Sequence, residues 1–545
     1  MLTCSYELRY LADGEEKIVV RGVETPDLSL RETDDGTRRT ITLTANREIE
    51  LLAYREWGHD CLSGTPSDNE RFFLNGYQSW TDTAERYATE RERDVTRLPA
   101  PLVRRFAFDR YGDAAFYPYD KGILHGYDLF YVRGGREGFF CSRNSDVAFL
   151  LFEVERAKGE VRLASDVAGA TLKGGGTFVL CDYLYADSVE GGMELFRSAY
   201  PERDVRKLLG YTSWYNYYQE ISESILLRDL AALDNRFQLF QVDDGYETFV
   251  GDWLDVDPVK FPNGLAPIVS AAHERGFLAG IWLAPFVAEG KSRLFREKPE
   301  WFRHDENGDP VLCGSNWSGF YALDLDNPAV REYIAGCLAH YADLGFDFFK
   351  LDFLYASHLP RYAGKTRAQA AADAYQFLRD SLGDKLILGC GASIFQSAGR
   401  FDYLRIGPDV SLVFDDVFYM RFMHRERIST KVTLQNTVYR SLFNRRFFGC
   451  DPDVFLLRDE NLSLSRRQRA ALLTVNALFG NLLMTSDNVS GYDDATQKQL
   501  GDALALFRDA RVIGSERKGK TIAICYDAGE GKRTVVYDTR KGVLL

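Results

Sequence analysis

The sequence is poor in the features that mark several large classes of protein. Its nine cysteines are scattered over 545 residues and never spaced as Cys-x-x-Cys, so neither a disulfide framework nor a zinc knuckle is expected. Basic residues number 67 against 80 acidic ones, and this net charge of −13 argues against a nucleic-acid partner. No apolar run approaches the roughly 20 residues of a membrane helix. Since no secretory signal stands at the N-terminus, we expect a cytoplasmic protein with reduced thiols and no membrane segment.

The motifs of several enzyme classes are missing as well. No Gly-x-Gly-x-x-Gly follows a predicted strand, and neither a P-loop nor a Gly-x-Ser-x-Gly elbow occurs. The seven histidines are isolated, without His-x-His or His-Glu-x-x-His, which argues against a zinc site.

The first 190 residues carry the pattern of a β-sandwich. Short alternating apolar runs at 48–54, 147–154, 161–165 and 177–184 are separated by clusters of glycine and aspartate. A helix is expected over 189–200.

From about residue 208, short apolar runs alternate with amphipathic helices. Several predicted helices have good end signals, such as Asn327-Pro328 and the capping boxes that begin at Thr366 and Ser465. Eight such units over about 280 residues fit a (β/α)8 barrel, with a doubly wound sheet as the alternative. The predicted strands are 210–214, 238–242, 277–283, 346–351, 385–388, 403–406, 447–450 and 482–485.

The rest of the chain is short. A last helix near 493–511 is followed by two predicted strands, 521–526 and 533–537. The predicted organisation is therefore an N-terminal sandwich over 1–190, a catalytic barrel over 205–490, and a last helix with a small β module over 491–545.

Acidic residues gather at the predicted strand ends, where barrel enzymes place their chemistry. Five of the eight ends carry at least one. They are Asp243 and Asp244, Asp352, Asp409, Asp451 and Asp453, and Asp487.

Lys350 and Asp352 lie two residues apart at the end of the fourth strand, so both point to one face. Because Phe349 and Leu351 take the helix side, that face is the barrel interior. A buried lysine would keep the aspartate ionised, as a carboxylate nucleophile requires. The alternative is a structural ion pair at the barrel mouth.

Arg405 and Asp409 follow the sixth strand, and Pro408 favours extended backbone before a rim carboxylate. Asp409 is a candidate acid/base, or alternatively the cap of a following turn. Two carboxyl groups that face each other across a pocket are the catalytic pair of most glycoside hydrolases, in which one attacks and the other protonates the leaving oxygen.

Other residues at the strand ends suit a sugar pocket. The adjacent Asp243 and Asp244 could bind neighbouring hydroxyls, or they could form a turn through Gly245. Cys390, between two glycines, is a small side chain at the fifth strand end. Three aromatic residues could be sugar platforms or could belong to the core: Trp214, Tyr215 and Trp282.

Eight short segments form an ordered set between about residues 70 and 490. They are NGYQSW at 75–80, GYTSWYNYY at 210–218, QVDDGYE at 241–247, GIWLAPF at 280–286, FFKLDFLY at 348–355, RIGPDV at 405–410, GCDPDVFLLR at 449–458 and GNLLMTSDN at 480–488. The set resembles glycoside hydrolase family 36, the bacterial α-galactosidases related to plant raffinose synthases. The resemblance implies a sandwich, a barrel and a C-terminal β domain, with a retaining mechanism on terminal α-linked galactose and no metal or organic cofactor.

The resemblance also implies roles for single residues. Asp352 matches the nucleophile, and Asp409 matches the acid/base. The remaining matches are to sugar-binding residues: Asp243 and Asp244 for the 4- and 6-hydroxyls, Lys350 and Arg405 as flanking cations, Trp282 as a pocket aromatic, and Trp80 as an aromatic lent by the N-terminal domain.

Two segments depart from the family's pattern. SLVFDD at 411–416 is less aromatic than expected, and GCGASIFQ at 389–396 lacks the serine- and glycine-rich loop that shapes the 2-hydroxyl side of the pocket. The sequence leaves open N-acetylgalactosamine as the sugar, transglycosylation of the raffinose-synthase type, and a non-catalytic carbohydrate-binding role. It does not indicate an oligomeric state.

Overall fold

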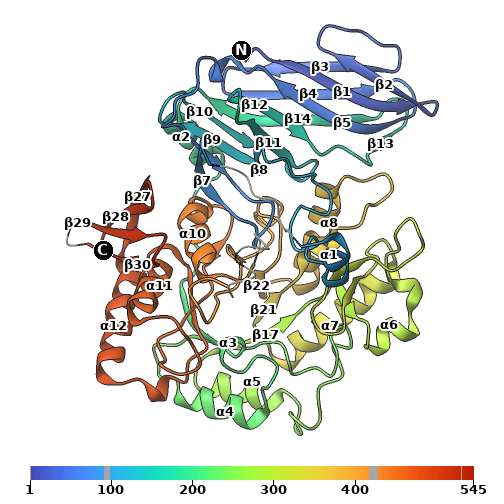
Figure 1. The fold of residues 1–545 in the computed structure, drawn as a ribbon. Helices are drawn as coiled ribbons and strands as arrows, with labels where there is room; N and C mark the ends of the chain where they lie inside the picture. The colour runs from blue at the N-terminus through green and yellow to red at the C-terminus, as the bar shows by residue number, and fades with distance from the viewer. Residues whose placement is uncertain (1, 91–97, 417–420, 422–426, 530) are drawn as a thin grey trace.

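The computed structural model describes residues 2–90, 98–416, 421, 427–529 and 531–545. A β-sandwich lies on top of a barrel, and a small C-terminal sheet lies at the side of the barrel (Figure 1). This is the fold class expected from the sequence. Within the described residues, no helix is both long and apolar enough to cross a membrane.

The N-terminal part consists of two antiparallel sheets whose strands alternate between buried and exposed side chains, as half-buried strands do. All four strands predicted from the alternating runs are confirmed as β5, β11, β12 and β14. The first sheet has the order β2 (Glu15–Val20), β1 (Ser5–Ala12), β5 (Ile49–Trp57), β12 (Glu160–Ser165), β11 (Leu150–Glu155) and β8 (Ile123–Tyr127), and β13 (Thr171–Leu172) pairs with β5. The second has the order β3 (Leu28–Asp34), β4 (Arg38–Ala45), β14 (Thr177–Ala186), β10 (Gly138–Ser142), β9 (Leu129–Arg133), β6 (Arg71–Leu74) and β7 (Ala84–Tyr87).

The central part is a closed parallel barrel. Its strands are β15 (Leu208–Thr212), β16 (Leu239–Val242), β17 (Leu278–Leu283), β21 (Phe348–Leu351), β22 (Leu386–Gly389), β23 (Tyr403–Arg405), β24 (Gly449–Asp451) with β25 (Val454–Phe455), and β26 (Leu482–Thr485). The ring closes because β26 pairs in parallel with both β25 and β15. This closure rules out the doubly wound alternative.

The barrel has one break that was not predicted, and one predicted strand end was wrong. The seventh strand is interrupted at Asp453, whose φ of 73° breaks the extended backbone between β24 and β25. Trp214 does not end the first strand but begins the one-turn helix α3 (Trp214–Tyr217), because Ser213 already has αR backbone angles.

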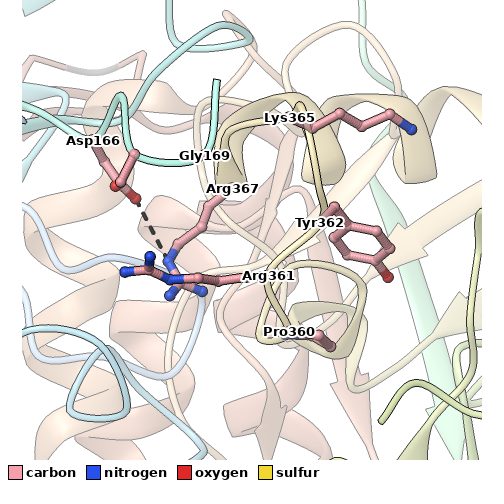
Figure 2. A pocket seen from close by; sticks show the side chains of 8 residues that line it. Asp166, Gly169, Pro360, Arg361, Tyr362, Lys365 and Arg367 are labelled. Atoms are coloured by element: carbon pink, nitrogen blue, oxygen red, sulfur yellow. Dashed lines mark ion pairs between the residues drawn. The ribbon is translucent and has the colours of Figure 1, made fainter. Parts of the chain in front are cut away.

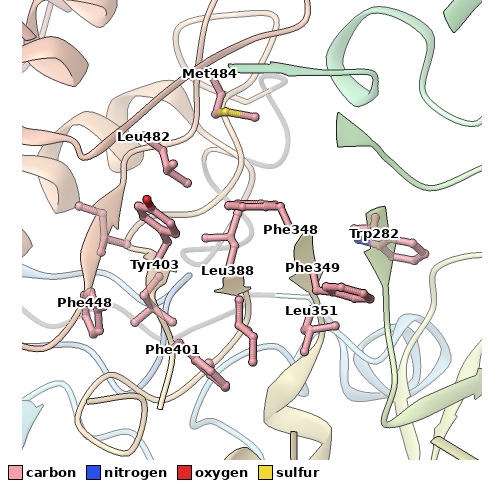
Figure 3. Packing of buried hydrophobic residues seen from close by; sticks show 14 of the residues in the cluster. Trp282, Phe348, Phe349, Leu351, Leu388, Phe401, Tyr403, Phe448, Leu482 and Met484 are labelled. Carbon is pink, nitrogen blue, oxygen red and sulfur yellow. The ribbon is translucent and has the colours of Figure 1, made fainter. Parts of the chain in front are cut away.

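The barrel strands bury both faces, so their sequences are continuous apolar runs. Figure 3 shows Phe348 directed toward Tyr403, and their ring centroids lie 5.8 Å apart. Phe349 and Leu351 leave the strand on the other side (Figure 3). Lys350 shares the face of Phe348, which confirms the predicted barrel-facing side.

The helices around the barrel begin where the sequence signals predicted. Asn327 caps α7, and both capping boxes are present, at Thr366 for α8 and Ser465 for α11. Gly345 ends α7 with a φ of 109°, which favours glycine. The principal helices are α2 (Val189–Ala199), α4 (Glu223–Ala232), α5 (Ala266–Glu274), α7 (Pro328–Leu344), α8 (Arg367–Leu382), α10 (Thr430–Arg440) and α11 (Arg466–Phe479).

The C-terminal part has more strands than expected. Helix α12 (Asp494–Asp509) leads into a sheet of β27 (Arg511–Lys518), β28 (Thr521–Asp527), β29 (Lys532–Asp538) and β30 (Val543–Leu544). The predicted pair corresponds to β28 and β29. The sequence analysis missed β27 because none of its residues is fully buried, so its sequence shows no apolar alternation.

Candidate active site

The carboxylate of Asp352 is buried at the end of β21 and is held by two neutral donors. The indole Nε1 of Trp282 donates to Oδ2 at 3.1 Å, and the backbone N–H of Phe353 donates to Oδ1 at 2.8 Å. Burial raises the pKa of Asp352, the charge of Lys350 lowers it, and the charge of Asp409 raises it further, so the net shift is upward. The two candidate catalytic carboxyl groups therefore interact electrostatically.

The hydrogen-bond partner of Lys350 is Asp243 rather than Asp352. The Nζ of Lys350 lies 2.9 Å from Oδ2 of Asp243, which also accepts from Gln241 at 2.6 Å and Thr212 at 3.0 Å. Burial lowers the pKa of Lys350, but the charges of Asp243 and Asp352 outweigh it and the net shift is upward. Lysine acts on Asp352 through space and remains charged.

Asp244 lies beside this pair and is bound from three directions. Its carboxylate accepts from Gln219 at 3.1 and 3.2 Å and from the indole Nε1 of Trp317 at 3.0 Å. It also has a hydrogen bond with the buried Glu247. Burial, together with the charge of Asp244, raises the pKa of Glu247 well above its usual value, so Glu247 is the protonated partner and the donor.

A second cluster is built around Arg405, at the end of β23. The buried guanidinium reaches three carboxylates: Asp409 at 2.9 Å, Asp451 at 2.9 Å and Asp453 at 3.0 Å. The pKa of Asp453 is raised to about 6, mainly by burial and further by the charges of Asp409 and Asp451. The charge of Arg405 and the hydrogen bond from the Tyr215 hydroxyl lower this pKa but do not cancel the rise. Asp409 is the most open of the three, with 32% of its side chain exposed.

The three aromatic residues proposed as platforms have different environments. Tyr215 is 2% exposed, and its hydroxyl donates to Asp453, so Tyr215 is part of the buried hydrogen-bond network around Arg405. Trp282 is also buried and orients Asp352. Trp214 alone is partly exposed.

Cys390 lies between the two clusters. Its thiol is buried, and its pKa is raised by burial and by Asp352, whereas Arg405 and Lys350 lower it. The charges of Asp352, Arg405 and Lys350 therefore all act on this buried side chain.

Trp80 reaches the barrel from the N-terminal part. Its ring makes edge contacts with Phe353 at 5.3 Å and Tyr355 at 5.7 Å between centroids. A Cβ on Gly391 would lie 3.0 Å from two ring carbons of Trp80, so a glycine is needed there. The loop that carries Trp80 also bonds to the barrel through Ser79 and Ala392.

Helix α10 fixes the same loop from the other side. Arg440 is fully buried and donates to the backbone oxygens of Gly76 and Gln78, at 3.2 and 2.8 Å, and to that of Ile406 at 2.8 Å. Asn436 bonds to Thr81 and Thr83. One arginine thus joins the Trp80 loop to the strand that leads to Asp409.

Several site residues were missed from the sequence. Trp317 lies between β19 (Leu312–Gly314) and β20 (Phe320–Ala322), in a small sheet inserted after β17. Apart from Trp80, the sequence analysis looked for site residues only at the strand ends, so this insertion was overlooked. The others are Gln219, Glu247 and Arg440, whose contacts join segments that no local pattern connects.

Two other polar clusters lie away from the strand ends. Figure 2 shows a small pocket in which Arg361 and Arg367 converge on Asp166, and Arg367 Nε lies 3.7 Å from a carboxylate oxygen. Within the described part of the chain, one set of three metal-ligand side chains, Cys4, Glu56 and His59, comes together in the sandwich core. Neither cluster shares a residue with the predicted site.

The chain is similar to known α-galactosidases. The sequence model of the family described as Melibiase matches residues 195–379, which include the Asp243 and Asp352 side of the site but end before Arg405. "Alpha-galactosidase 2" of Pediococcus pentosaceus is 28% identical over 183 residues, or 30% of this chain and 24% of that protein. An "A type blood alpha-D-galactosamine galactosaminidase" of Flavonifractor plautii is 34% identical over 124 residues, or 21% of this chain and 11% of that protein.

A solved structure matches much more of the chain. An α-galactosidase from Thermus thermophilus, in complex with p-nitrophenyl α-D-galactopyranoside, has a TM-score of 0.71 and 26% identity, and the match covers 92% of this chain and 98% of that one. By contrast, the chain matches a quarter or less of the length of the two curated relatives.

The fold and the acidic strand ends define a barrel of the glycoside hydrolase class. Within that class, the Melibiase model matches the first part of the barrel, and the resemblance of the chain to glycoside hydrolase family 36 is confirmed.

Proposed function

We propose that the chain is a retaining α-galactosidase that releases terminal α-linked galactose from oligosaccharides of the melibiose and raffinose type. The observation that carries the proposal is the pair of carboxyl groups on opposite clusters, Asp352 beside Lys350 and Asp409 on Arg405. The names of the relatives support it, and so does a second structure of the Thermus enzyme, in complex with stachyose.

Asp352 would act as the nucleophile. Its oxygen attacks the anomeric carbon, the bond to the leaving oxygen breaks, and a covalent glycosyl-enzyme forms. The two neutral donors, Trp282 and the Phe353 N–H, fix the carboxylate without neutralising it. The nearby Lys350 favours the ionised form, which is the form that attacks.

Asp409 would act as the acid and then as the base. It gives its proton to the leaving oxygen, and in the second step it takes a proton from the water that attacks the glycosyl-enzyme. Its partly exposed position lets it meet both the leaving group and water.

Asp244, Asp243 and Lys350 would bind hydroxyl groups of the galactose. Asp244 accepts from Trp317, and Lys350 donates to Asp243, so the orientation of these groups is set before the sugar binds. Such preorganised polar groups discriminate strongly between sugars, because a missing hydroxyl leaves a buried group unpaired.

A second candidate sugar is N-acetylgalactosamine, because one relative is named as a galactosaminidase. Transfer of galactose to another sugar would use the same residues. The cytoplasmic location remains a prediction.

The test is a panel of nitrophenyl α- and β-glycosides with the purified protein. We expect the highest kcat/KM with the α-galactoside and little turnover of β-glycosides. A preference for the α-N-acetylgalactosaminide would replace galactose with the second candidate. No release of nitrophenol from any α-glycoside would contradict the proposal.

A further inference from the structure

A strained aromatic residue stands at the rim of the barrel. Tyr218, directly after α3, has φ 49° and ψ −131°, a combination that residues other than glycine rarely adopt. Its amide donates to the carbonyl of Trp214 at 2.7 Å, and the amide of Glu220 donates to Tyr217 at 2.9 Å. Strain of this kind costs about 1–3 kcal/mol and persists only where the surroundings fix it.

The residue that follows shows what fixes the backbone. The side chain of Gln219 donates to Asp244, and its carbonyl accepts from Lys260 at 2.8 Å. Gly245 packs so closely that a Cβ there would lie 2.7 Å from the Gln219 backbone. The strained segment is therefore tied to a candidate sugar-binding aspartate.

Packing into the core does not explain Tyr218. The residue is 43% exposed, and its ring stands edge-on to Trp214 with centroids 5.1 Å apart and planes at 85°. The partial burial of this tyrosine is worth about 1–2 kcal/mol, no more than its backbone strain costs, so it leaves no net gain from packing. This combination is typical of a binding role.

The segment that carries the pair contacts both clusters of the site, Asp244 through Gln219 and the Arg405 cluster through Tyr215. Tyr215, between the two in sequence, donates its hydroxyl to Asp453 and accepts from Arg458 through its carbonyl at 2.7 Å. Burial raises the pKa of Tyr218, and both Arg458 and Asp409 act on its hydroxyl, the first lowering and the second raising that pKa.

A general acid must lie within hydrogen-bond reach of the oxygen that it protonates. The leaving group must therefore occupy the space next to Asp409, on the open side of the site. An aromatic ring exposed there can pack against the C–H face of a sugar while its hydroxyl stays in water.

We propose that Tyr218, supported by Trp214, is the platform for the leaving-group sugar, the ring joined to galactose through the bond that is cleaved. The inference rests on the proposed function and adds the residue that selects oligosaccharides over galactosides with small leaving groups. The same ring would hold an acceptor sugar in the reverse transfer, because acceptor and leaving group occupy the same place.

The test compares melibiose with α-galactosyl fluoride, whose leaving group has no ring. For Tyr218→Ala we expect the ratio of kcat/KM for melibiose to that for the fluoride to fall by about tenfold. Tyr218→Phe keeps the ring and should hold the ratio within about twofold of the wild type. Ile513→Ala, at a similarly exposed position in the C-terminal sheet, is the control and should not change the ratio.

Tyr218→Gly separates the ring from the backbone. Glycine adopts the observed angles without strain, so this variant should unfold at or above the wild-type temperature. Its ratio of kcat/KM for melibiose to kcat/KM for the fluoride should still fall, as in the alanine variant. Equal losses with both substrates, or an unchanged ratio in the alanine and glycine variants, would overturn the platform. Inactivity of the wild type on both substrates would instead overturn the proposed function and the platform with it.

Discussion

Two buried cations organise the two sides of the site, and they do so differently. Lys350 makes one ion pair, to Asp243, and influences Asp352 only through space. Arg405 lies within 3.0 Å of three carboxylates at once. A planar guanidinium offers five donors in fixed directions, whereas an ammonium is a compact charge on a flexible stem.

The difference suits the two proposed roles. Asp352 is buried and makes no direct ion pair with any residue that the structure describes, so its oxygens stay available for attack. Asp409 is held by an arginine at the open edge, where it can meet a leaving group and water. The comparison suggests that lysine sets the charge of the nucleophile and arginine sets the position of the acid/base.

The largest expected effect is on the proposed nucleophile, Asp352. Asp352→Asn keeps the size of the side chain but removes the attacking carboxylate, so kcat should fall at least about ten-thousandfold, which is roughly 5.5 kcal/mol of barrier. Steady-state kinetics with a nitrophenyl α-galactoside would measure it, with circular dichroism as a check on the fold. Activity within tenfold of the wild type would show that Asp352 is not the nucleophile.

Removing each cation in turn tests the contrast between them. Arg405→Met leaves three carboxylates facing one another and should cost about 3–5 kcal/mol of unfolding free energy. Lys350→Met should cost less, because Asp243 keeps its bonds from Gln241, Thr212 and the Asp244 amide. Urea unfolding of both variants at pH 7 measures the two losses of unfolding free energy. Equal losses would contradict the proposed difference between Arg405 and Lys350.

The Arg405 cluster should also give a pH signature. The pKa of Asp453 is about 6 in the folded chain against about 3.9 in an unfolded one, so the folded state holds its proton longer. Stability from this group is therefore present at low pH and is lost as pH rises from about 4 through 6, by roughly 2–3 kcal/mol.

Asp453→Asn cannot titrate and should lack this loss. Urea unfolding at pH 4, 5, 6 and 7 would measure the unfolding free energy of both proteins. The wild type should lose stability relative to the variant as the pH rises over that range. Parallel curves would contradict the assignment.

The smallest expected effect concerns the N-terminal contribution. In Gly391→Ala the new Cβ would push Trp80 aside, so KM should rise by a few-fold up to about tenfold, or about 1.4 kcal/mol. Gly399→Ala, in the same loop and also at positive φ, has nothing within 4 Å of its Cβ and is the matched control. Both variants should lose about 1 kcal/mol of stability or more. A rise in KM for Gly399→Ala as well would point to the loop backbone and not to Trp80.

Much of the barrel could be predicted from the sequence because its signals are local. The runs of apolar residues, the cap at Asn327 and the capping boxes at Thr366 and Ser465 each act within a few residues. The order of the strands then follows from their order in the chain. The carboxylates at the strand ends were found in the same way.

The partner of Lys350 shows where this reasoning stops. Its spacing from Asp352 suggested a pair along one strand, but side chains inside a barrel form layers from alternate strands. Lys350 on the fourth strand therefore meets Asp243 from the second. The bonds from Arg440 to the Trp80 loop join residues more than 350 positions apart, and no local pattern carries that information.

Azide rescue tests the central claim most directly, because it reports both roles in one experiment. Asp352→Gly and Asp409→Gly are each incubated with an activated α-galactoside and sodium azide, and NMR identifies the product. The account predicts β-galactosyl azide from Asp352→Gly, by direct displacement, and α-galactosyl azide from Asp409→Gly, by attack on the glycosyl-enzyme. The opposite pair of products, or β-galactose as the first sugar released by the wild type, would contradict it.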